Sequence, residues 1–468
     1  MPDRRATPED RPAVDLPASL RERLSTRHGV DVSALEAALN ESPPISIRLN
    51  PAKGFDPEGA RVPWCASGRY LPRRPAFTFD PLLHAGCYYV QEAASMLLEQ
   101  AVVQSDLQGP CVAALDLCAA PGGKSTHLRS LIHPTSLLVA NEPDGLRRAV
   151  LQENLWKWGQ PNVVIAGGLR PKAPRAPLFD LVLVDAPCSG EGMFRKDPQA
   201  RHQWSEGLVR QCSAVQQDLA AAAWELLLPG GTLIYSTCTW EEAENEAQVR
   251  SLLEQGAELV PLTLPAGVDA VPGHGGAGLR CYPHRMPGEG FFLAVLRKPG
   301  ERSGTPAAEA PRRGETPWST WLRPAPGGHH ATEQDGTVHV VDGTWRALLR
   351  KVDAVLRVVS PGIPVAEHKG GDLHPTAALG LSGLLQPGAF AEVEADEGTA
   401  LRYLRGEALE ASDATGFALL RHRGYALGWL KGAGRRWNNR WPVPWRIRSA
   451  APLAQRVSWS AQNDAQAP

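Results

Sequence analysis

Residues 114–128 read ALDLCAAPGGKSTHL, and this stretch decides the fold. An apolar run ends at Asp116, a short turn follows, and helix-forming residues begin at Lys124. Gly122 and Gly123 allow the backbone of the turn to bend sharply and to approach a ligand closely. A strand that leads through such a turn into a helix indicates an α/β fold, in which a ligand lies beyond the carboxyl ends of the strands.

The same pattern of strand and helix repeats as far as residue 298. Apolar strands are expected over six segments: 111–117, 136–142, 162–168, 179–187, 231–239 and 290–298. Helices are expected between them, over 124–132, 144–159 and 209–228. This alternation predicts a doubly wound, mainly parallel sheet, which forms a Rossmann-like core over residues 106–298.

Residues 1–105 mix helical and strand signals and are expected to form a separate α/β region. One or two amphipathic helices are expected over 16–40, a strand over 45–51 and a helix over 88–103. Two or three domains are the expectation for a chain of 468 residues.

The region after the core begins with residues 299–317, which are rich in Pro, Gly, Ala and charge and are typical of a linker. A C-terminal domain is expected over 318–449, and a disordered tail over 450–468. Seven of the 14 tryptophans fall in this C-terminal domain, and Trp459 follows it.

The composition is that of a globular protein, with 43% hydrophobic residues and a formal net charge of -1. This charge gives no global attraction to nucleic acid, so any such contact must come from local basic patches. The eight cysteines include no C-x-x-C pair and are sparse for a disulfide framework, so we expect no metal site. The charged start has no signal-peptide core, and no run reaches the roughly 18 apolar residues of a membrane helix. We therefore expect a cytoplasmic protein that acts as a monomer.

The turn after the first strand predicts a nucleoside ligand without phosphates. The turn matches neither the phosphate loop nor G-x-G-x-x-G. The next strand ends at Glu142, whose carboxylate is well placed to accept both hydroxyls of a ribose. On its own, a glycine turn after a strand is more often a plain turn without a ligand. An acid after a strand is, on its own, more often a helix cap. Their order and spacing together favour S-adenosylmethionine as the cofactor.

Two cysteines and a carboxyl group follow the fourth and fifth strands, in VDAPCSGEG and YSTCTW. Asp185, Cys188 and Cys238 would share one pocket if these strands are neighbours. A thiolate that adds to carbon 6 of cytosine makes carbon 5 nucleophilic, and a group at ring N3 stabilises the charge that develops. Asp185 is placed to supply the N3 interaction, and Lys124 is a candidate cation that lowers the pKa of the attacking thiol. The spacing leaves open which thiol attacks.

The other cysteines are expected to be structural. A lone cysteine is usually a small buried hydrophobe, and this interpretation is given to Cys65, Cys87, Cys111, Cys212 and Cys281. Cys118 lies in the cofactor turn, where its backbone matters more than its thiol.

These segments together resemble the Sun-type RNA (cytosine-5) methyltransferases, and within them the RsmF-like branch that modifies bacterial 16S rRNA. The similar segments run in family order from about residue 45 to 298: ISIRLNP, YYVQEAASMLLEQ, LDLCAAPGGKSTHL, VANE, LVDAPCSGEGMFRKDP, LLPGGTLIYSTCTWEEAENE and YPHRMPGEGFFLAVLRK. A looser resemblance over 318–449 implies a β-rich domain similar to PUA RNA-binding domains. The fold implied is a class I S-adenosylmethionine-dependent methyltransferase core between two RNA-binding regions.

The resemblance implies a role for each cysteine. The T-C cysteine of the family is the nucleophile, here Cys238, and the P-C cysteine assists release of the methylated RNA, here Cys188. DNA cytosine-5 methyltransferases attack with the P-C cysteine, so the chemistry permits either order. The resemblance also assigns contacts with the cofactor or the target base to Cys118, Ala119, Ala120, Pro121, Gly122, Gly123, Lys124, Glu142 and Asp185.

One departure from the family pattern lies after the third strand, where the family usually carries an aspartate near the adenine. Here residues 164–169 read VIAGGL and contain no acid. We therefore expect the backbone to make the adenine contact.

Residues 421–450 carry eight basic side chains and no acidic one, with tryptophans among them. Basic groups neutralise phosphates and aromatic rings stack on bases, although a solvated basic face over core tryptophans would show the same pattern. The candidates for RNA contact in this segment are Arg421, Arg423, Trp429, Lys431, Arg435, Arg436, Trp437, Arg440, Trp441, Trp445, Arg446 and Arg448. Further candidates are Arg48, Tyr89, Gln91, Arg195, Lys196 and Arg201.

Two other functions stay open. A weakly active or inactive RNA-binding factor for ribosome assembly could be built on the same fold, and the missing third-strand acid is its only support. An amino-methyltransferase would carry an Asn/Asp-Pro-Pro-aromatic turn after the fourth strand, whereas DAPC lacks the aromatic residue and adds a thiol.

Overall fold

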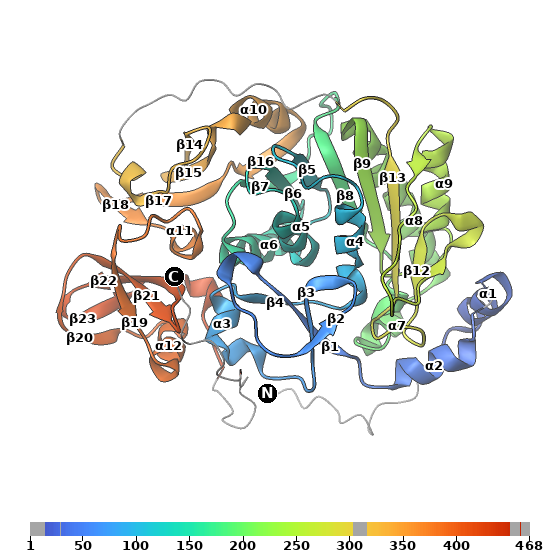
Figure 1. Ribbon diagram of the computed structural model, residues 1–468, viewed down its shortest axis with the longest axis horizontal. Coiled ribbons are helices and arrows are strands. Elements are labelled where there is room, and N and C mark those ends of the chain that lie inside the picture. Colours follow the sequence, from blue (N-terminus) through green and yellow to red (C-terminus); the bar gives the residue numbers. More distant parts are fainter. Residues whose placement is uncertain (1–14, 29, 303–315, 450–458, 460–468) are drawn as a thin grey trace.

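The computed structural model describes residues 15–28, 30–302, 316–449 and Trp459 (Figure 1). The expected linker therefore lies largely outside the described residues, and so does the expected tail apart from Trp459. Among the described residues, no helix has both the length and the apolar character needed to cross a membrane.

The N-terminal region forms two helices and a small antiparallel sheet. The helices are α1 (Ala18–His28) and α2 (Val32–Asn40), and the sheet has the order β2-β3-β1-β4. Its strands are β1 (Ile45–Leu49), β2 (Ala60–Val62), β3 (Cys65–Leu71) and β4 (Tyr88–Val90).

The prediction of a single helix over 88–103 is wrong for its first residues. The first three residues, Tyr-Tyr-Val, form β4, because they pair with β1 in the register Leu49 to Tyr88 and because aromatic and β-branched residues suit a half-buried strand. Helical structure begins only at a short 3-10 helix (Ala94–Leu97) and continues as α4 (Leu98–Val103).

The core is a ten-stranded sheet in the order β11-β12-β13-β9-β8-β5-β6-β7-β16, with β10 beside β13. Its five central strands are parallel, which confirms the expected sheet. They are β5 (Ala113–Asp116), β6 (Leu137–Asn141), β7 (Val163–Leu169), β8 (Phe179–Asp185) and β9 (Leu227–Thr237). Antiparallel strands extend the sheet beyond β9: β10 (Glu258–Leu259), β11 (Val271–Pro272), β12 (Leu279–Cys281) and β13 (Phe291–Arg297).

Both faces of this sheet are buried. Leu181 and Leu183 of β8 belong to one apolar cluster, and Val182 and Val184 belong to another, because successive side chains of a strand point to opposite faces. The first cluster includes residues of α4, α5 (Gly123–Leu131) and α6 (Gly145–Trp158). The second includes residues of α8 (Glu206–Leu226), α9 (Glu246–Glu254) and α10 (Arg346–Val355). Two shorter helices are α3 (Pro81–His84) and α7 (Pro198–Gln203).

The C-terminal region contributes to the core sheet as well as forming sheets of its own. Strand β16 (Leu356–Ser360) pairs antiparallel with β7 and covers its edge. Just before α10, Trp345 is buried in the second apolar cluster and donates a hydrogen bond from Nε1 to the Thr135 oxygen at 2.9 Å. Residues 318–449 thus do not form a unit that is separate in space from the core.

Two further sheets complete this region (orange and red in Figure 1). A four-stranded sheet has the order β14 (His329–Gln334), β15 (Thr337–Asp342), β17 (Ile363–Lys369) and β18 (Asp372–Pro375). A five-stranded sheet has the order β19 (Ala391–Glu394), β21 (Phe417–His422), β22 (Tyr425–Gly432), β23 (Gly434–Asn439) and β20 (Leu409–Ala414). The helices here are α11 (Ala377–Leu381) and α12 (Glu397–Leu404).

Candidate active site

The turn between β5 and α5 contains a buried carboxyl group. Ser125 donates a hydrogen bond from Oγ to Oδ2 of Asp116 at 2.7 Å. Oδ1 of Asp116 is buried and has no hydrogen-bond partner among the residues that the structure describes. Burial, partly opposed by the Ser125 hydrogen bond, raises the pKa of Asp116 to about 7. Gly122 has a φ of 113°, which only glycine adopts easily, so the turn needs this residue as expected.

Glu142 lies at the end of the neighbouring strand β6. Its side chain is buried, and its Oε1 accepts the Asp144 N–H at 2.9 Å. Arg147 lies 3.4 Å from its Oε2 and also donates to the Ala120 oxygen at 3.1 Å. The expected ribose-binding acid and the glycine turn are therefore linked by one arginine.

Asn141 ties three strand ends together, a function that no local pattern in the sequence indicated. Its Nδ2 donates to the Leu117 oxygen at 2.9 Å, and its Oδ1 accepts the Gly168 N–H at 2.8 Å. The end of β7 has no acidic side chain; instead Arg357 of β16 donates to the Gly167 oxygen at 2.9 Å. A Cβ on Gly167 would lie only 2.9 Å from the Arg357 guanidinium, so a side chain there would disturb the contact with β16.

The two candidate cysteines meet, as expected, at the carboxyl ends of the adjacent strands β8 and β9. The Sγ atoms of Cys188 and Cys238 are 3.2 Å apart, and the Cys238 N–H points to Cys188 Sγ at 3.4 Å. The hydrogen bond with Cys238, followed by burial, raises the pKa of the Cys188 thiol well above its ordinary value. Both thiols can therefore act on the same bound group.

Lys124 and Asp185 form an ion pair beside the thiols. Lys124 Nζ lies 2.8 Å from Asp185 Oδ2, and Ser236 Oγ donates to Asp185 Oδ1 at 2.9 Å. Burial acts to lower the pKa of Lys124, but the charge of Asp185 and its hydrogen bond, followed by the charge of Cys238, raise it above its ordinary value. The ammonium group thus carries a positive charge close enough to act on Cys238.

A buried polar network lies behind the thiols, and the sequence did not reveal it. Ser189, Glu191 and Glu244 are all 5% exposed or less, although polar runs such as EEAENE normally face solvent. Gln216 of α8 joins the network with a hydrogen bond from Nε2 to Glu244 Oε2 at 2.8 Å. A sequence signal is absent because each acid becomes buried only when β8, β9 and α8 pack together.

Cys87 and Cys281 are buried as expected, whereas Cys111 and Cys212 are half-buried. Cys65 is buried too, but it has polar partners. Its thiol donates to Glu99 Oε2 at 3.0 Å, and His127 Nε2 lies 3.2 Å from the same oxygen. These three side chains could hold a metal ion, since their ligand atoms lie within 4.8 Å of one another. The same atoms satisfy one another by hydrogen bonding, so no ion is needed to explain the cluster.

The candidates for RNA contact fall into three groups: buried, half-buried and exposed. Trp429 and Trp441 are 1% and 2% exposed, and Arg48, Gln91 and Arg195 are also buried, so these side chains pack inside the protein. Arg195, for example, pairs with Glu289 at 3.0 Å. The exposed candidates are Lys196, Arg423, Arg435, Arg436 and Arg448.

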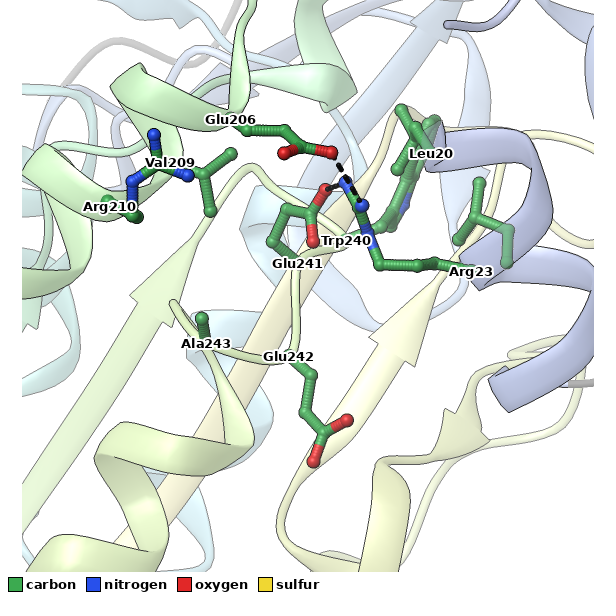
Figure 2. Close-up of a pocket in the computed structure, with 10 residues that line it drawn as sticks. Leu20, Arg23, Glu206, Val209, Arg210, Trp240, Glu241, Glu242 and Ala243 are labelled. Atoms are coloured by element: carbon green, nitrogen blue, oxygen red, sulfur yellow. Dashed lines mark hydrogen bonds and ion pairs between the residues drawn. The ribbon is translucent and has the colours of Figure 1, made fainter. Parts of the chain in front are cut away.

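The N-terminal helix α1 packs against the segment that follows Cys238. A cavity of about 270 Å³ lies between them, lined by residues that include Leu20, Val209 and Trp240. Figure 2 shows Arg23 of α1 reaching both Glu241, at 2.6 Å, and Glu206 of α8, at 3.3 Å. The N-terminal region therefore supports the loop that carries the second thiol.

Comparison with known proteins gives the same assignment over most of the chain. Residues 110–297 match the family model of the 16S rRNA methyltransferase RsmB/F, residues 16–93 match the N-terminal domain of RsmF, and residues 390–447 match the RsmF PUA domain. Ribosomal RNA small subunit methyltransferase F of Aeromonas salmonicida is 34% identical over 81% of this chain and 84% of its own. The chain belongs to the RsmB/F family of 16S rRNA methyltransferases.

Other relatives agree with this RsmB/F assignment. The methyltransferase F of Erwinia tasmaniensis is 39% identical over 52% of this chain and 55% of its own. A crystal structure of PH0851 is 30% identical, with a TM-score of 0.55, and covers 60% of this chain and 66% of that chain. The structure of NSun6 from Pyrococcus horikoshii with SFG shares the fold, with 20% identity, a TM-score of 0.50, and coverage of 61% of this chain and 99% of that chain.

This RsmB/F protein is accordingly a methyltransferase that uses S-adenosylmethionine to methylate carbon 5 of cytosine in RNA. The residues at the strand ends fit that cofactor. Glu142 offers a buried carboxylate to a ribose diol, and Asp116 keeps one buried oxygen without a partner among the described residues. The match to the RsmF PUA domain at 390–447 covers the five-stranded sheet.

Proposed function

We propose that this enzyme methylates cytosine in 16S rRNA through a covalent bond between Cys238 and carbon 6 of the target base. The observation that carries the proposal is the pair of thiols 3.2 Å apart beside the Lys124–Asp185 ion pair. Covalent attack requires the base to leave its stack, so we propose an unpaired or flipped cytosine as the substrate.

Cys238 is the nucleophile in this proposal. Its thiolate adds to carbon 6, the ring electrons move to carbon 5, and Asp185 holds the ring at N3 as charge develops. Bound S-adenosylmethionine supplies an electrophilic methyl group to carbon 5. Lys124 orients Asp185 through the ion pair between its Nζ and Asp185 Oδ2 at 2.8 Å.

Cys188 serves the release step. Release removes the proton from carbon 5, and the electron pair of that bond re-forms the ring double bond as the bond between carbon 6 and sulfur breaks. Cys188 Sγ lies within 3.2 Å of Cys238 Sγ, so it is in position to assist this elimination.

The cofactor is held by the turn from Cys118 to Lys124 and by Glu142. We propose that Glu142 binds the ribose and that the backbone of Gly167 and Gly168 lies beside the adenine. The proposed units are 1–105 for RNA recognition, 106–298 for catalysis and 318–449 for RNA binding. We further propose a monomer that works in the cytoplasm on the RNA of the small ribosomal subunit, which is the substrate that the names of the bacterial relatives give.

The test is methyl transfer from labelled S-adenosylmethionine to unmodified 16S rRNA, with detection of 5-methylcytidine. We expect Cys238→Ala to abolish transfer and Cys188→Ala to accumulate a protein–RNA adduct. Cys111→Ala is the matched control, because Cys111 lies before β5, at the other end of the strand from the site. Absence of transfer by the wild-type protein under conditions where it binds the cofactor would support the inactive RNA-binding alternative.

A further inference from the structure

The buried network behind the thiols contains two acids bridged by one hydroxyl group. Ser189 Oγ lies 2.9 Å from Glu191 Oε1 and also makes a hydrogen bond with Glu244 Oε1. Glu191 and Glu244 are both fully buried. Two buried carboxylates this close cannot both ionise at little cost.

A count of the protons places one of them on Glu244. Oε2 of Glu244 accepts the Ser189 N–H at 3.0 Å and the Gln216 Nε2–H at 2.8 Å. Oε1 of Glu191 accepts the Trp204 Nε1–H at 2.6 Å. The Ser189 hydroxyl has a single proton, so it can donate to only one acid. Thr239 Oγ1 also donates to Oε1 of Glu244, at 3.4 Å. Both contacts of the Ser189 hydroxyl are satisfied if Oε1 of Glu244 carries a proton and donates to Ser189, which donates to Glu191.

The network holds the backbone on both sides of Cys188. Glu244 accepts the N–H of Ser189, which follows Cys188, and Gln216 Nε2 donates to the oxygen of Pro187, which precedes it, at 2.8 Å. Thr239, which follows Cys238, places its Oγ1 3.1 Å from Ser189 Oγ. The network thus sets the position of one thiol loop relative to the other.

We propose that Glu191 and Glu244 share one proton through Ser189, and that this singly protonated pair positions Cys188 beside Cys238 for release of the methylated RNA. This inference rests on the proposed function only where it is tested by the release of RNA, because the melting-temperature test needs no activity. Glu244 and Glu191 are positioning residues, because they act through the Cys188 loop.

The surroundings favour retention of this proton. Burial, followed by the charge of Glu191, raises the pKa of Glu244 to about 7, and burial raises the pKa of Glu191 above its ordinary value. The titratable groups that interact with the pair are themselves acids: Cys188, Cys212, Tyr235 and Glu241. Ionisation of Glu244 would therefore add a second negative charge among acids and loosen the Cys188 loop.

The test compares two isosteric variants. In Glu244→Gln the amide N–H can replace the proton on Oε1 while the amide oxygen keeps the two donors at Oε2, so we expect release and thermal stability close to wild type. In Glu191→Gln the amide nitrogen would occupy the position of Oε2 of Glu191, which is buried and has no partner among the described residues. A buried donor without a partner is costly, so we expect release about tenfold slower and a lower melting temperature.

The pH dependence of the release rate shows whether Glu244 positions Cys188 or only stabilises the fold. Release by the wild-type enzyme, followed as decay of the protein–RNA adduct, should slow as the pH rises above about 7, since Glu244 then loses its proton. If Cys188 acted as a base in its ionised form, its ionisation would instead make release faster as the pH rises. Glu244→Gln should abolish the fall. Glu242→Gln is the control, since Glu242 pairs with Arg250 outside the network and should leave the wild-type profile unchanged.

A second readout needs no activity. A carboxyl whose folded pKa is raised binds its proton more tightly in the folded state, so its stabilising effect is complete below about pH 4.5 and is lost as the pH rises to about 7. The melting temperature of the wild type should fall more over this range than that of Glu244→Gln. The proposal of a shared proton would be wrong if the melting temperature fell equally in the wild type and in Glu244→Gln. It would also be wrong if Glu191→Gln matched Glu244→Gln in release rate and melting temperature. If the melting temperatures differ as expected while no protein–RNA adduct forms, the proposed covalent mechanism is wrong, but the shared proton between Glu191 and Glu244 stands.

Discussion

At the residue scale, the chemistry of the two thiols depends on which neighbouring side chains carry a charge. The Lys124–Asp185 ion pair fixes the carboxylate that would face the base, and the same ammonium acts on Cys238. On the other side, Cys188 faces Glu244, whose proton keeps negative charge away from the release thiol. The two thiols are close in space and differ in their surroundings, which gives a physical reason for two different steps.

Glu142 is the residue on which cofactor affinity should depend most. Glu142→Gln keeps the shape of the side chain but removes the charge that accepts the ribose hydroxyls. Hydrogen bonds to charged groups contribute about 1.5–3 kcal/mol, so we expect the dissociation constant for S-adenosylmethionine to rise by roughly tenfold to a hundredfold. Isothermal titration calorimetry measures it.

Glu225→Gln is the control, because Glu225 pairs with Arg175 at the surface. Unchanged cofactor affinity in Glu142→Gln would remove Glu142 from the ribose contact.

At the scale of elements, two loops after β8 and β9 must lie against each other. The Gly192 N–H donates to the Cys238 oxygen at 2.8 Å, and Gly192 packs against Gly290, just before β13. A Cβ on Gly192 would lie 2.3 Å from the Gly290 oxygen and 2.8 Å from the Cys238 oxygen, so no side chain fits between the loops.

Gly192→Ala should therefore push the two thiol loops apart. Overpacking of this kind typically costs about 1–3 kcal/mol, and we expect a matching loss of stability in urea unfolding together with a loss of methyl transfer. Gly207→Ala is the matched control, since its Cβ in α8 would make only ordinary contacts, the nearest at 3.7 Å. Equal stability of the two variants would contradict the close approach.

Local patterns predicted most of the elements and missed those that depend on distant partners. The turn at Gly122, the five parallel strands and the meeting of Cys188 with Cys238 follow from periodicity and strand order. The strand Tyr88–Val90 was expected to be helical, because only its pairing with β1 distinguishes it. The burial of Glu191 and Glu244 escaped prediction for the same reason: their neighbours come from three separate elements.

At the scale of the whole molecule, the N-terminal and C-terminal regions are tied into the methyltransferase core. Strand β16 extends the core sheet beside β7, and α1 packs on the loop after Cys238. Buried side chains of the N-terminal sheet and of the five-stranded sheet form one apolar cluster, which includes Ile47, Tyr88, Leu427 and Trp441. The N-terminal and C-terminal regions therefore contact each other as well as the methyltransferase core (Figure 1).

The exposed arginines of β23 should bind RNA phosphates. A variant with both Arg435→Glu and Arg436→Glu should bind 16S rRNA more weakly, and the slope of log affinity against log salt should become shallower by roughly 0.7 for each phosphate of single-stranded RNA that is no longer neutralised. Cofactor affinity should not change. Arg402→Glu is the control, because Arg402 lies on α12 of the same region and is paired with Glu407.

Unchanged RNA affinity in the double variant would show that this basic face is only solvated. Trp429 and Trp441 are buried, as that alternative requires of core tryptophans, so the exposed arginines decide between the two interpretations.

Attack on the base by Cys238, and not by Cys188, is the step on which the proposed mechanism depends. It is tested most directly by trapping the wild-type enzyme with S-adenosylmethionine on 16S rRNA that contains 5-fluorocytidine, because fluorine at carbon 5 cannot leave as a proton does. Mass spectrometry of the cross-linked peptide then identifies the bonded sulfur. We expect the peptide that contains Cys238. A cross-link at Cys188 would contradict this mechanism and reverse the two steps.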